Sequence, residues 1–324
     1  MIEIEFTPED VARTRFVVSP LWEVIVSVRV LKGADELGIH RVWSEQVRAR
    51  VAAARVDLTP LTDLVPVPTR AIAGFLTPPP TTPLTSLDVE LATLRATTPE
   101  SLTTSSAIPP ERMAALRADP DRELGRLAET IETYWELALA PYWPQILTLL
   151  QGDVSFRARR LVEGGARHLF NDLDPQVTWD AGTLHVQNRF TGGRRTLDGR
   201  GLLLMPSAFV WPRVFSSLDG GPQPTLRYPP RGIGTLWATP TRTAEYDALA
   251  GVLGRSRATL LAELTAPAST TDLARRTGLT PGGVSQHLSA LRAAGLVGAH
   301  RAGRTVLYAR TQAAETLLAA ARSA

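Results

Sequence analysis

The feature that most constrains the fold is segment 269–297, in which the signals for two short helices flank a glycine turn. Ser269, with Asp272 three residues later, has the capping-box pattern that begins a helix. Gly278 ends that helix, and a Thr-Pro pair at Thr280 caps and begins the next one. A short helix, a turn that contains glycine and a second helix together predict a helix-turn-helix.

The second of these helices has two unlike faces. Val284, Leu288 and Leu291 recur at the spacing of a single apolar stripe, which predicts the buried side. The opposite side carries small and hydrogen-bonding residues instead of the charges typical of a merely solvated helix. Small residues allow close approach to a groove, and a glutamine amide can pair with both hydrogen-bonding atoms of an adenine edge. The residues predicted to contact bases in a major groove are Gly282, Ser285, Gln286 and Ser289.

Two strand-like runs follow this helix and enclose a loop that contains Gly303. Arginines at such a loop can hold phosphates or enter a minor groove. With a closing helix at 313–321, these elements predict a winged helix. The predicted phosphate contacts are Ser269, Thr270, Thr280, His287, Arg292, Arg301 and Arg304. For His287, the alternative of packing at the edge of the module stays open.

Three segments of this module resemble the ArsR family of bacterial winged-helix repressors, in order and in spacing: residues 253–261, 272–297 and 303–308. The resemblance implies dimeric, sequence-specific DNA binding, usually with repression that a ligand relieves. We therefore expect a homodimer on a double-stranded, pseudo-palindromic operator. The family's metal sensors carry cysteines where this chain has Ser and Thr at 269–271, so neither a metal nor another cofactor is expected.

The charge distribution is that of a module that meets a polyanion. Residues 241–324 contain 10 arginines and 5 acidic residues, a net charge of +5. The rest of the chain contains 25 basic and 27 acidic residues, a net charge of −2. A basic end on a near-neutral body favours nucleic-acid binding. The chain has no cysteine and no apolar run long enough for a membrane span, so we expect a cytoplasmic, nucleoid-associated protein without a membrane partner.

The helix signals and apolar spacing in residues 1–240 predict a large helical body. A Ser-Pro pair at Ser19 begins one helix. Residues 110–173 follow a helical pattern with an apolar residue every three or four positions. Pro141 and Pro144 interrupt this pattern, so we expect a break or bend there.

A smaller part of the same body predicts strands. Residues 177–186 alternate around a glycine turn in the manner of a hairpin. Further strands are expected at 202–208, 213–217 and 225–228. The expected fold class is therefore mainly α with α+β character: a helical body with a small antiparallel sheet, followed by the winged helix.

Helix signals return after Pro240, which marks a domain boundary. The expected domains are residues 1–240, for effector binding and dimerisation, and residues 241–324, the winged helix-turn-helix that binds DNA. Residues 1–240 resemble an uncharacterised domain found ahead of such modules in regulators from high-GC bacteria. That resemblance implies no mechanism.

Aromatic residues are concentrated in the first domain, which holds all seven tryptophans of the chain. Two Tyr-Trp pairs flank the proline break. One interpretation is a pocket for an apolar or aromatic small-molecule effector, since such pockets have apolar walls. The other, which we favour, is packing in the core and at a dimer interface. The candidate pocket residues are Tyr134, Trp135, Tyr142 and Trp143.

Catalytic motifs are absent from the sequence, and we assign no catalytic residues. Gly232 and Gly234 lack the third glycine of a dinucleotide loop. His168 and Asp172, four residues apart, predict a structural hydrogen bond. The leading hypothesis is a ligand-responsive repressor that is not an enzyme. The alternatives are a constitutive repressor with a body that only dimerises, and a small-molecule receptor or vestigial enzyme domain with a DNA-targeting tail.

Overall fold

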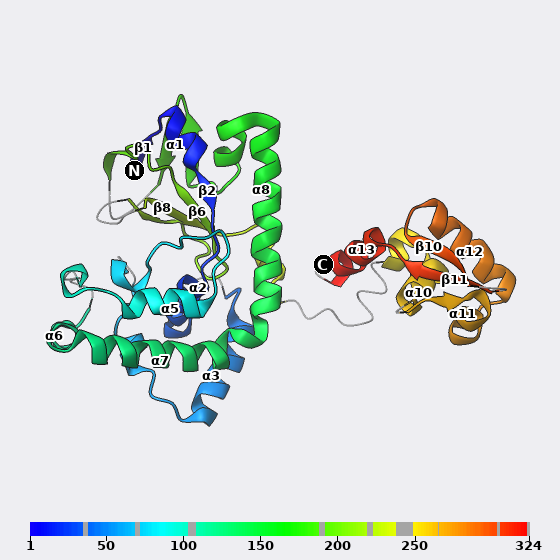
Figure 1. Cartoon of the computed structure of the whole chain (residues 1–324), viewed down its shortest axis with the longest axis horizontal. Coiled ribbons are helices and arrows are strands. Elements are labelled where there is room, and N and C mark those ends of the chain that lie inside the picture. Colours follow the sequence, from blue (N-terminus) through cyan, green and yellow to red (C-terminus); the bar gives the residue numbers. More distant parts are fainter. Residues whose placement is uncertain are drawn as a thin grey trace. The chain divides into compact units, whose positions relative to one another are not determined.

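The chain folds into two compact units, Met1–Trp237 and Ala238–Ala324, which we describe separately (Figure 1). Both are rich in helix and carry small sheets, so the expected fold class, mainly α with α+β character, is confirmed. This computed structural model describes residues 1–34, 38–68, 72–102, 108–187, 192–218, 223–237, 249–264, 266–302 and 305–322.

The first unit has helices at the predicted start after Ser19 and along the predicted helical region 110–173. Its described α-helices are α1 (Pro8–Arg13), α2 (Pro20–Arg29), α3 (Arg41–Ala54), α4 (Thr59–Thr62), α5 (Leu87–Arg95), α6 (Pro110–Ala118), α7 (Pro120–Ala138) and α8 (Trp143–Asn171). The Ser19 hydroxyl caps α2 by accepting the Trp22 N–H at 2.9 Å. Between α7 and α8 a single 3-10 turn, Ala140–Tyr142, confirms the predicted break at the prolines.

The strands of this unit form two four-stranded sheets, with the orders β3-β4-β1-β5 and β2-β6-β8-β7. Their bounds are β1 (Ile2–Glu5), β2 (Arg15–Phe16), β3 (Val177–Asp180), β4 (Thr183–Val186), β5 (Gly193–Thr196), β6 (Leu203–Pro206), β7 (Phe215–Ser217) and β8 (Thr225–Tyr228). The predicted hairpin at 177–186 is confirmed as β3 and β4.

The expectation of a single antiparallel sheet needs correction. The described strands form two sheets and both are mixed, because β1 pairs parallel with β5, and β6 pairs parallel with both β2 and β8. The pairs of β1 and β2 join the first 16 residues of the chain to strands near residue 200. Local alternation of side chains reveals a strand but not so distant a partner, which is why the sequence did not show this topology.

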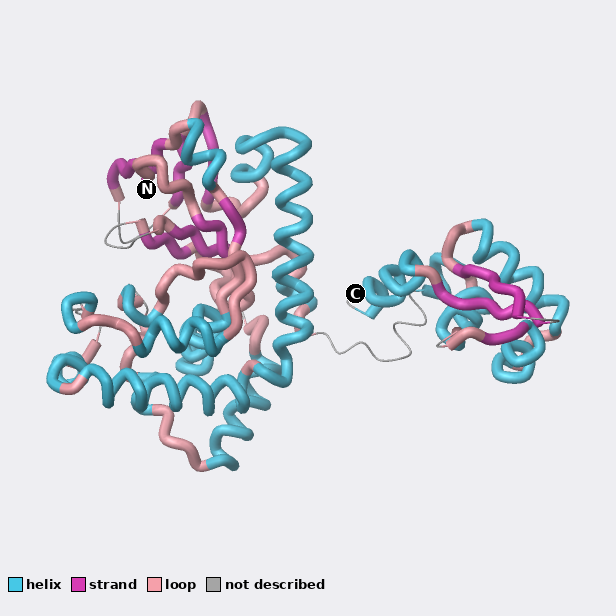
Figure 2. The backbone as a smooth tube through the Cα atoms, in the orientation of Figure 1, coloured by secondary structure: helices cyan, strands magenta, loops and turns pink. Residues whose placement is uncertain are grey.

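The sheet β2-β6-β8-β7 lies between two apolar cores. Leu203 and Met205 contribute to the core around α2, whereas Leu204 and Tyr228 contribute to the core shared with the other sheet. In Figure 2 the strands gather at one end of the unit, and α8 runs from the helical end to the strands. Every residue of α2 is buried, including Glu23, so this helix is the centre of the unit.

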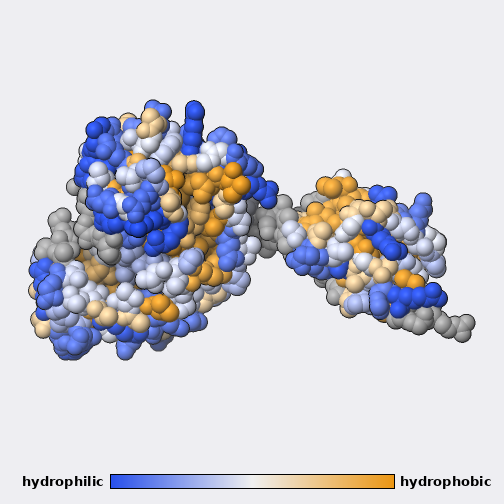
Figure 3. All heavy atoms as spheres, turned by 45° about the horizontal axis from the view of Figure 1, so that its top comes forward, coloured by the Kyte–Doolittle hydropathy of each residue, from blue (hydrophilic) through white to orange (hydrophobic). Residues whose placement is uncertain are grey.

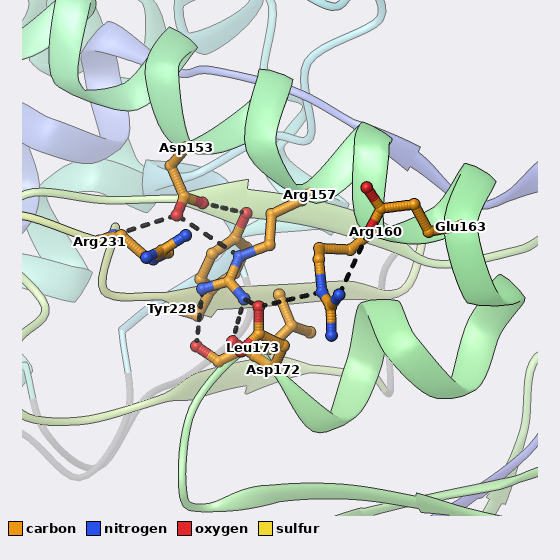
Figure 4. A network of polar contacts seen from close by, with 8 residues as sticks. All are labelled: Asp153, Arg157, Arg160, Glu163, Asp172, Leu173, Tyr228 and Arg231. Carbon is orange, nitrogen blue, oxygen red and sulfur yellow. Dashed lines mark hydrogen bonds and ion pairs between the residues drawn. The ribbon is translucent and has the colours of Figure 1, made fainter.

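A polar network fixes the second half of α8 against β8 (Figure 4). The helix bends at Gly165, where φ is 64°, and beyond the bend Asp172 returns toward Arg157. The Asp172 carboxylate lies 3.1 Å from Arg157 and 3.6 Å from Arg160. These ion pairs replace the hydrogen bond to His168 that the sequence predicted, because Asp172 follows the last residue of the helix and faces back along it.

The second unit contains the predicted winged helix. Its described elements are α10 (Arg255–Glu263), β9 (Ala268–Ser269), α11 (Thr270–Thr277), α12 (Pro281–Ala293), β10 (Val297–Ala302), β11 (Thr305–Arg310) and α13 (Gln312–Arg322). Gly254, with φ 81°, separates α10 from a helical piece at 249–253. Throughout the described parts of both units, no helix combines the length and apolar character of a membrane span.

Candidate nucleic-acid interface

The first helix of the pair, α11, begins in a complete capping box. The Ser269 hydroxyl donates to the Asp272 carboxylate at 2.7 Å and accepts the Asp272 N–H at 3.1 Å. The side-chain bond from Ser269 is the main cause that lowers the pKa of Asp272. The hydroxyl thus caps the helix, and Ser269 is half-exposed; a phosphate contact from this residue stays a prediction.

The turn that leads into α12 uses its glycines for different purposes. Gly278, with φ 72°, ends α11, and the Thr280 hydroxyl accepts the Gly283 N–H at 3.2 Å. A Cβ on Gly283 would lie 3.1 Å from that hydroxyl, so the cap itself favours a glycine there. A Cβ on Gly282 would meet nothing within 4 Å. The packing of this unit therefore does not require a glycine at position 282, and the backbone there is open to an approaching surface.

The two faces of α12 separate as the sequence predicts. Val284, Leu288 and Leu291 are at most 1% exposed and form part of the apolar core of the unit. The structure brings all four residues predicted to contact bases to the opposite, exposed face. These residues are Gly282, Ser285, Gln286 and Ser289. They occur at intervals of three and four, which places them in one row along the helix.

The residues that flank this row differ in exposure. Thr280 and Arg292 are exposed, and Thr270 is half-buried. His287 is half-buried, and its Nδ1 is buried without a hydrogen-bond partner. This burial favours the alternative in which His287 packs at the edge of the module.

The wing is a regular antiparallel hairpin of β10 and β11. Arg301 is exposed and lies opposite Val306 in the hairpin; Arg304 lies outside the described residues. The strand β9 adds to β11 through the pair Ser269 and Leu307. The hairpin is thus hydrogen-bonded to the first residues of the helix pair, so wing and helices form one framework.

Several arginines of this unit are used inside it. Arg310 donates to the carbonyls of Leu261 at 2.7 Å and of Ala262 at 2.6 Å, at the end of α10. Arg276 pairs with Glu263 at 3.5 Å. Arg310 and Arg276, two of the ten arginines counted in the sequence, therefore hold the unit together. Arg275, with a side chain 80% exposed on α11, is a candidate phosphate contact that the sequence analysis missed.

The aromatic residues proposed as an effector pocket make separate contacts. Tyr134 is fully buried, and its hydroxyl lies 2.9 Å from that of Ser27. The Trp135 and Trp143 rings pack edge to face at 5.0 Å. Tyr142 packs against Trp237 at 5.5 Å. These contacts favour the packing interpretation.

Buried ionisable groups in the first unit were also missed. Glu23 and Arg29 lie on the fully buried helix α2, and burial raises the pKa of Glu23 to about 8. His40 is buried as well, and burial, together with the charge of Arg29, lowers its pKa to about 3. The signal in the sequence was the presence of charged residues inside the apolar run 21–31. Among the described residues, no cluster of three His, Asp or Glu side chains could hold a metal ion.

Comparison with known proteins identifies one segment of the chain. Curated proteins and solved structures give no match. The family model described as bacterial regulatory protein, arsR family, matches residues 259–298, from α10 to the start of β10. The match lends no support to the separate resemblance suggested for residues 1–240. Residues 259–298 are therefore an ArsR-like helix-turn-helix segment, similar to that of bacterial regulatory proteins of the arsR family.

Proposed function

We propose that this protein is a sequence-specific DNA-binding regulator that inserts the exposed face of α12 into a major groove. The observation that carries the proposal is the row of small and hydrogen-bonding residues on that face, led by Gly282, which its own unit leaves unobstructed. Gln286 and Ser285 read base edges, with Ser289 beside them. Phosphates are held by Thr280 and the arginines 275, 292, 301 and 304.

The protein acts as a homodimer in this proposal, and its two-fold symmetry matches a pseudo-palindromic operator with half-sites about one or two helical turns apart. Exposed apolar side chains in both units are suited to such contacts. Val162 on α8 is 87% exposed and Val252 is 79% exposed. Figure 3 shows a continuous apolar area on one face of the Met1–Trp237 unit, bordered by hydrophilic surface. Large exposed apolar areas favour association.

The first unit is the part that responds to a ligand, and binding of the ligand relieves repression. Arg227 supports this role over a purely dimerising scaffold, because it is buried and has no ionic partner among the described residues. We place the protein in the cytoplasm, on the nucleoid, and assign it no enzymatic activity.

DNA binding can be tested with the full-length chain and a DNA duplex selected for binding from random sequences. Fluorescence anisotropy over a range of salt concentrations measures the affinity. The double variant Gln286→Glu and Ser289→Glu places two negative charges on the exposed face of α12 and should abolish specific binding. Gln151→Glu, an exposed change on α8, is the matched control and should bind as the wild type does. If the double variant binds with unchanged affinity, α12 is not the reading element.

A further inference from the structure

Two guanidinium groups meet two aromatic rings beside the sheet β2-β6-β8-β7. Arg227, on β8, is 4% exposed, and its guanidinium carbon lies 4.1 Å from the centroid of the Trp22 ring. Phe215 is the partner of Arg227 on β7 and packs against Trp22 at 5.9 Å. Arg29 lies over Phe215 at 5.3 Å. Elements from three parts of the chain thus converge on one buried cationic and aromatic cluster.

Arg227 has no counter-charge in this cluster. No described residue forms a hydrogen bond or ion pair with its guanidinium, and its Nε is buried without a partner. Burial lowers the pKa of Arg227 to about 10, and no carboxylate acts against that shift. Burying an unpaired charge is strongly unfavourable in a folded protein. An anion bound beside Arg227 would compensate this buried charge.

The carboxylates near α2 are already committed. Both oxygens of Glu23 accept the Ala208 N–H at 3.2 Å. Glu90 accepts the Ser19 hydroxyl at 2.5 Å and the Leu21 N–H at 2.8 Å. These two groups stabilise the loop after β6 and the start of α2, so neither neutralises Arg227.

Arg157 shows how the same unit treats a buried arginine that has a structural role. Arg157 is 1% exposed and pairs with Asp153 at 3.4 Å and with Asp172 at 3.1 Å (Figure 4). It also donates to the carbonyls of Asp172 and Leu173. Tyr228, adjacent to Arg227 on β8, belongs to this network through its bond to Asp153. Arg157 is therefore paired with two carboxylates and two carbonyls, whereas Arg227, beside Tyr228 on β8, has no such partner among the described residues.

We propose that Arg227 is the anchor of a binding site for a small oxyanion, a carboxylate or a phosphate, carried on an aromatic or apolar body. The guanidinium offers a planar set of donors that fits either oxyanion. Trp22 and Phe215 supply the apolar walls that such sites have. The strand β7 is at the edge of its sheet and Phe215 is only half-buried, so a ligand can approach from that edge. The regulatory meaning of this site rests on the function proposed above, whereas binding itself does not.

Binding is measured by calorimetry on the full chain without DNA, with four probes: benzoate, phenyl phosphate, inorganic phosphate and the neutral benzamide. We expect saturable binding of benzoate or phenyl phosphate, weaker binding of inorganic phosphate, and none of benzamide. Arg227→Gln should lower the affinity for the probe that binds about tenfold or more, because it removes a charge-assisted hydrogen bond. Arg159→Gln, which removes an exposed arginine of α8, should change nothing.

The proposal is overturned if neither aromatic anion binds at about 10 mM, a concentration that would detect millimolar affinity. It is also overturned if benzamide binds as well as benzoate, or if Arg227→Gln binds like the wild type. Should Arg227→Gln fail to fold, Arg227→Lys keeps the charge but loses the planar fork, and should bind with intermediate affinity. Preference between benzoate and phenyl phosphate identifies the oxyanion.

Stability without a ligand gives an independent reading. Arg227→Met removes an unpaired buried charge, so in dilute Tris buffer its unfolding midpoint should equal or exceed that of the wild type. A large drop would mean that Arg227 has a structural partner, which contradicts the site. Because these measurements contain no DNA, loss of operator binding by an α12 variant leaves them unaffected, and the two proposals fail separately.

Discussion

The two units treat polar side chains in opposite ways. Within the described part of the Ala238–Ala324 unit, every buried residue is apolar, and the hydrogen-bonding groups of α12 face outward. The Met1–Trp237 unit buries many titratable groups. They are Asp10, Glu23, Arg29, His40, Glu90, Asp153, Arg157 and Arg227. The difference fits the surface recognition that we propose for the second unit and the ligand binding that we propose for the first.

This contrast also separates what each unit can tolerate. An apolar core positions a helix without dictating its outer face, so the face of α12 is free to match an external surface. A buried ion pair restricts which side chains can surround it, because removing one partner leaves the charge of the other buried and uncompensated. We therefore expect changes inside the first unit to affect stability, and changes on α12 to affect binding alone.

The largest effect is expected from Arg157→Met. This change leaves Asp153 buried without its partner and should destabilise the first unit by about 3–5 kcal/mol. Urea unfolding followed by tryptophan fluorescence reports this unit selectively, because every tryptophan precedes residue 238. Arg159→Met, exposed on the same helix, should leave the midpoint unchanged. A small effect of Arg157→Met would show that the network of Figure 4 adds little to stability.

A second effect depends on pH and comes from Glu23. Its pKa is about 8 in the folded chain and 4.5 when unperturbed. The folded state thus keeps a proton that the unfolded chain releases above pH 4.5. The stability that this proton supplies is complete below pH 4.5 and is lost as the pH rises through 8.

Glu23→Gln, which is neutral at every pH, should remove this dependence. As the pH rises from 5 to 8.5, the free energy of unfolding of the variant should increase relative to that of the wild type by about a few kcal/mol, the order of magnitude that corresponds to the pKa shift of Glu23. Urea unfolding at several pH values measures the difference. Parallel pH profiles for the variant and the wild type would mean that Glu23 is ionised in the folded unit.

On α12, Gln286→Ala should leave unfolding unchanged and reduce discrimination at one base position of each half-site by about 1–3 kcal/mol. The comparison requires a specific and a random duplex at one salt concentration, since phosphate contacts alone weaken both equally. Equal losses on the two duplexes would assign Gln286 to the phosphates. A change in the unfolding midpoint would contradict its placement on the exposed face.

The same contrast explains how far the sequence could predict the structure. Caps and apolar stripes lie within one or two helical turns, so the start of α2 and the two faces of α12 were predicted correctly. The surroundings of Arg227 are formed by residues of α2 and β7, which are distant from it or not predictable as its neighbours. Likewise, the parallel partners of β1 and β2 lie near residue 200. No local pattern encodes such distances. Charged residues inside the apolar run 21–31 indicated burial, but not which groups would surround them.

A change at Ser269 tests whether this side chain stabilises the second unit or contacts DNA. The sequence predicts a phosphate contact, whereas the structure commits the hydroxyl to the cap of α11. Ser269→Ala should therefore destabilise this unit by about 1 kcal/mol, the usual loss for a capping residue, measured by amide hydrogen exchange because the unit lacks tryptophan. DNA affinity at low temperature, where the unit stays folded, should be unchanged. Ser285→Ala is the matched serine on the exposed face and should do the reverse, with unchanged exchange and weaker specific binding. If Ser269→Ala instead lost affinity without losing protection, the hydroxyl would leave its cap on binding and the sequence prediction would hold.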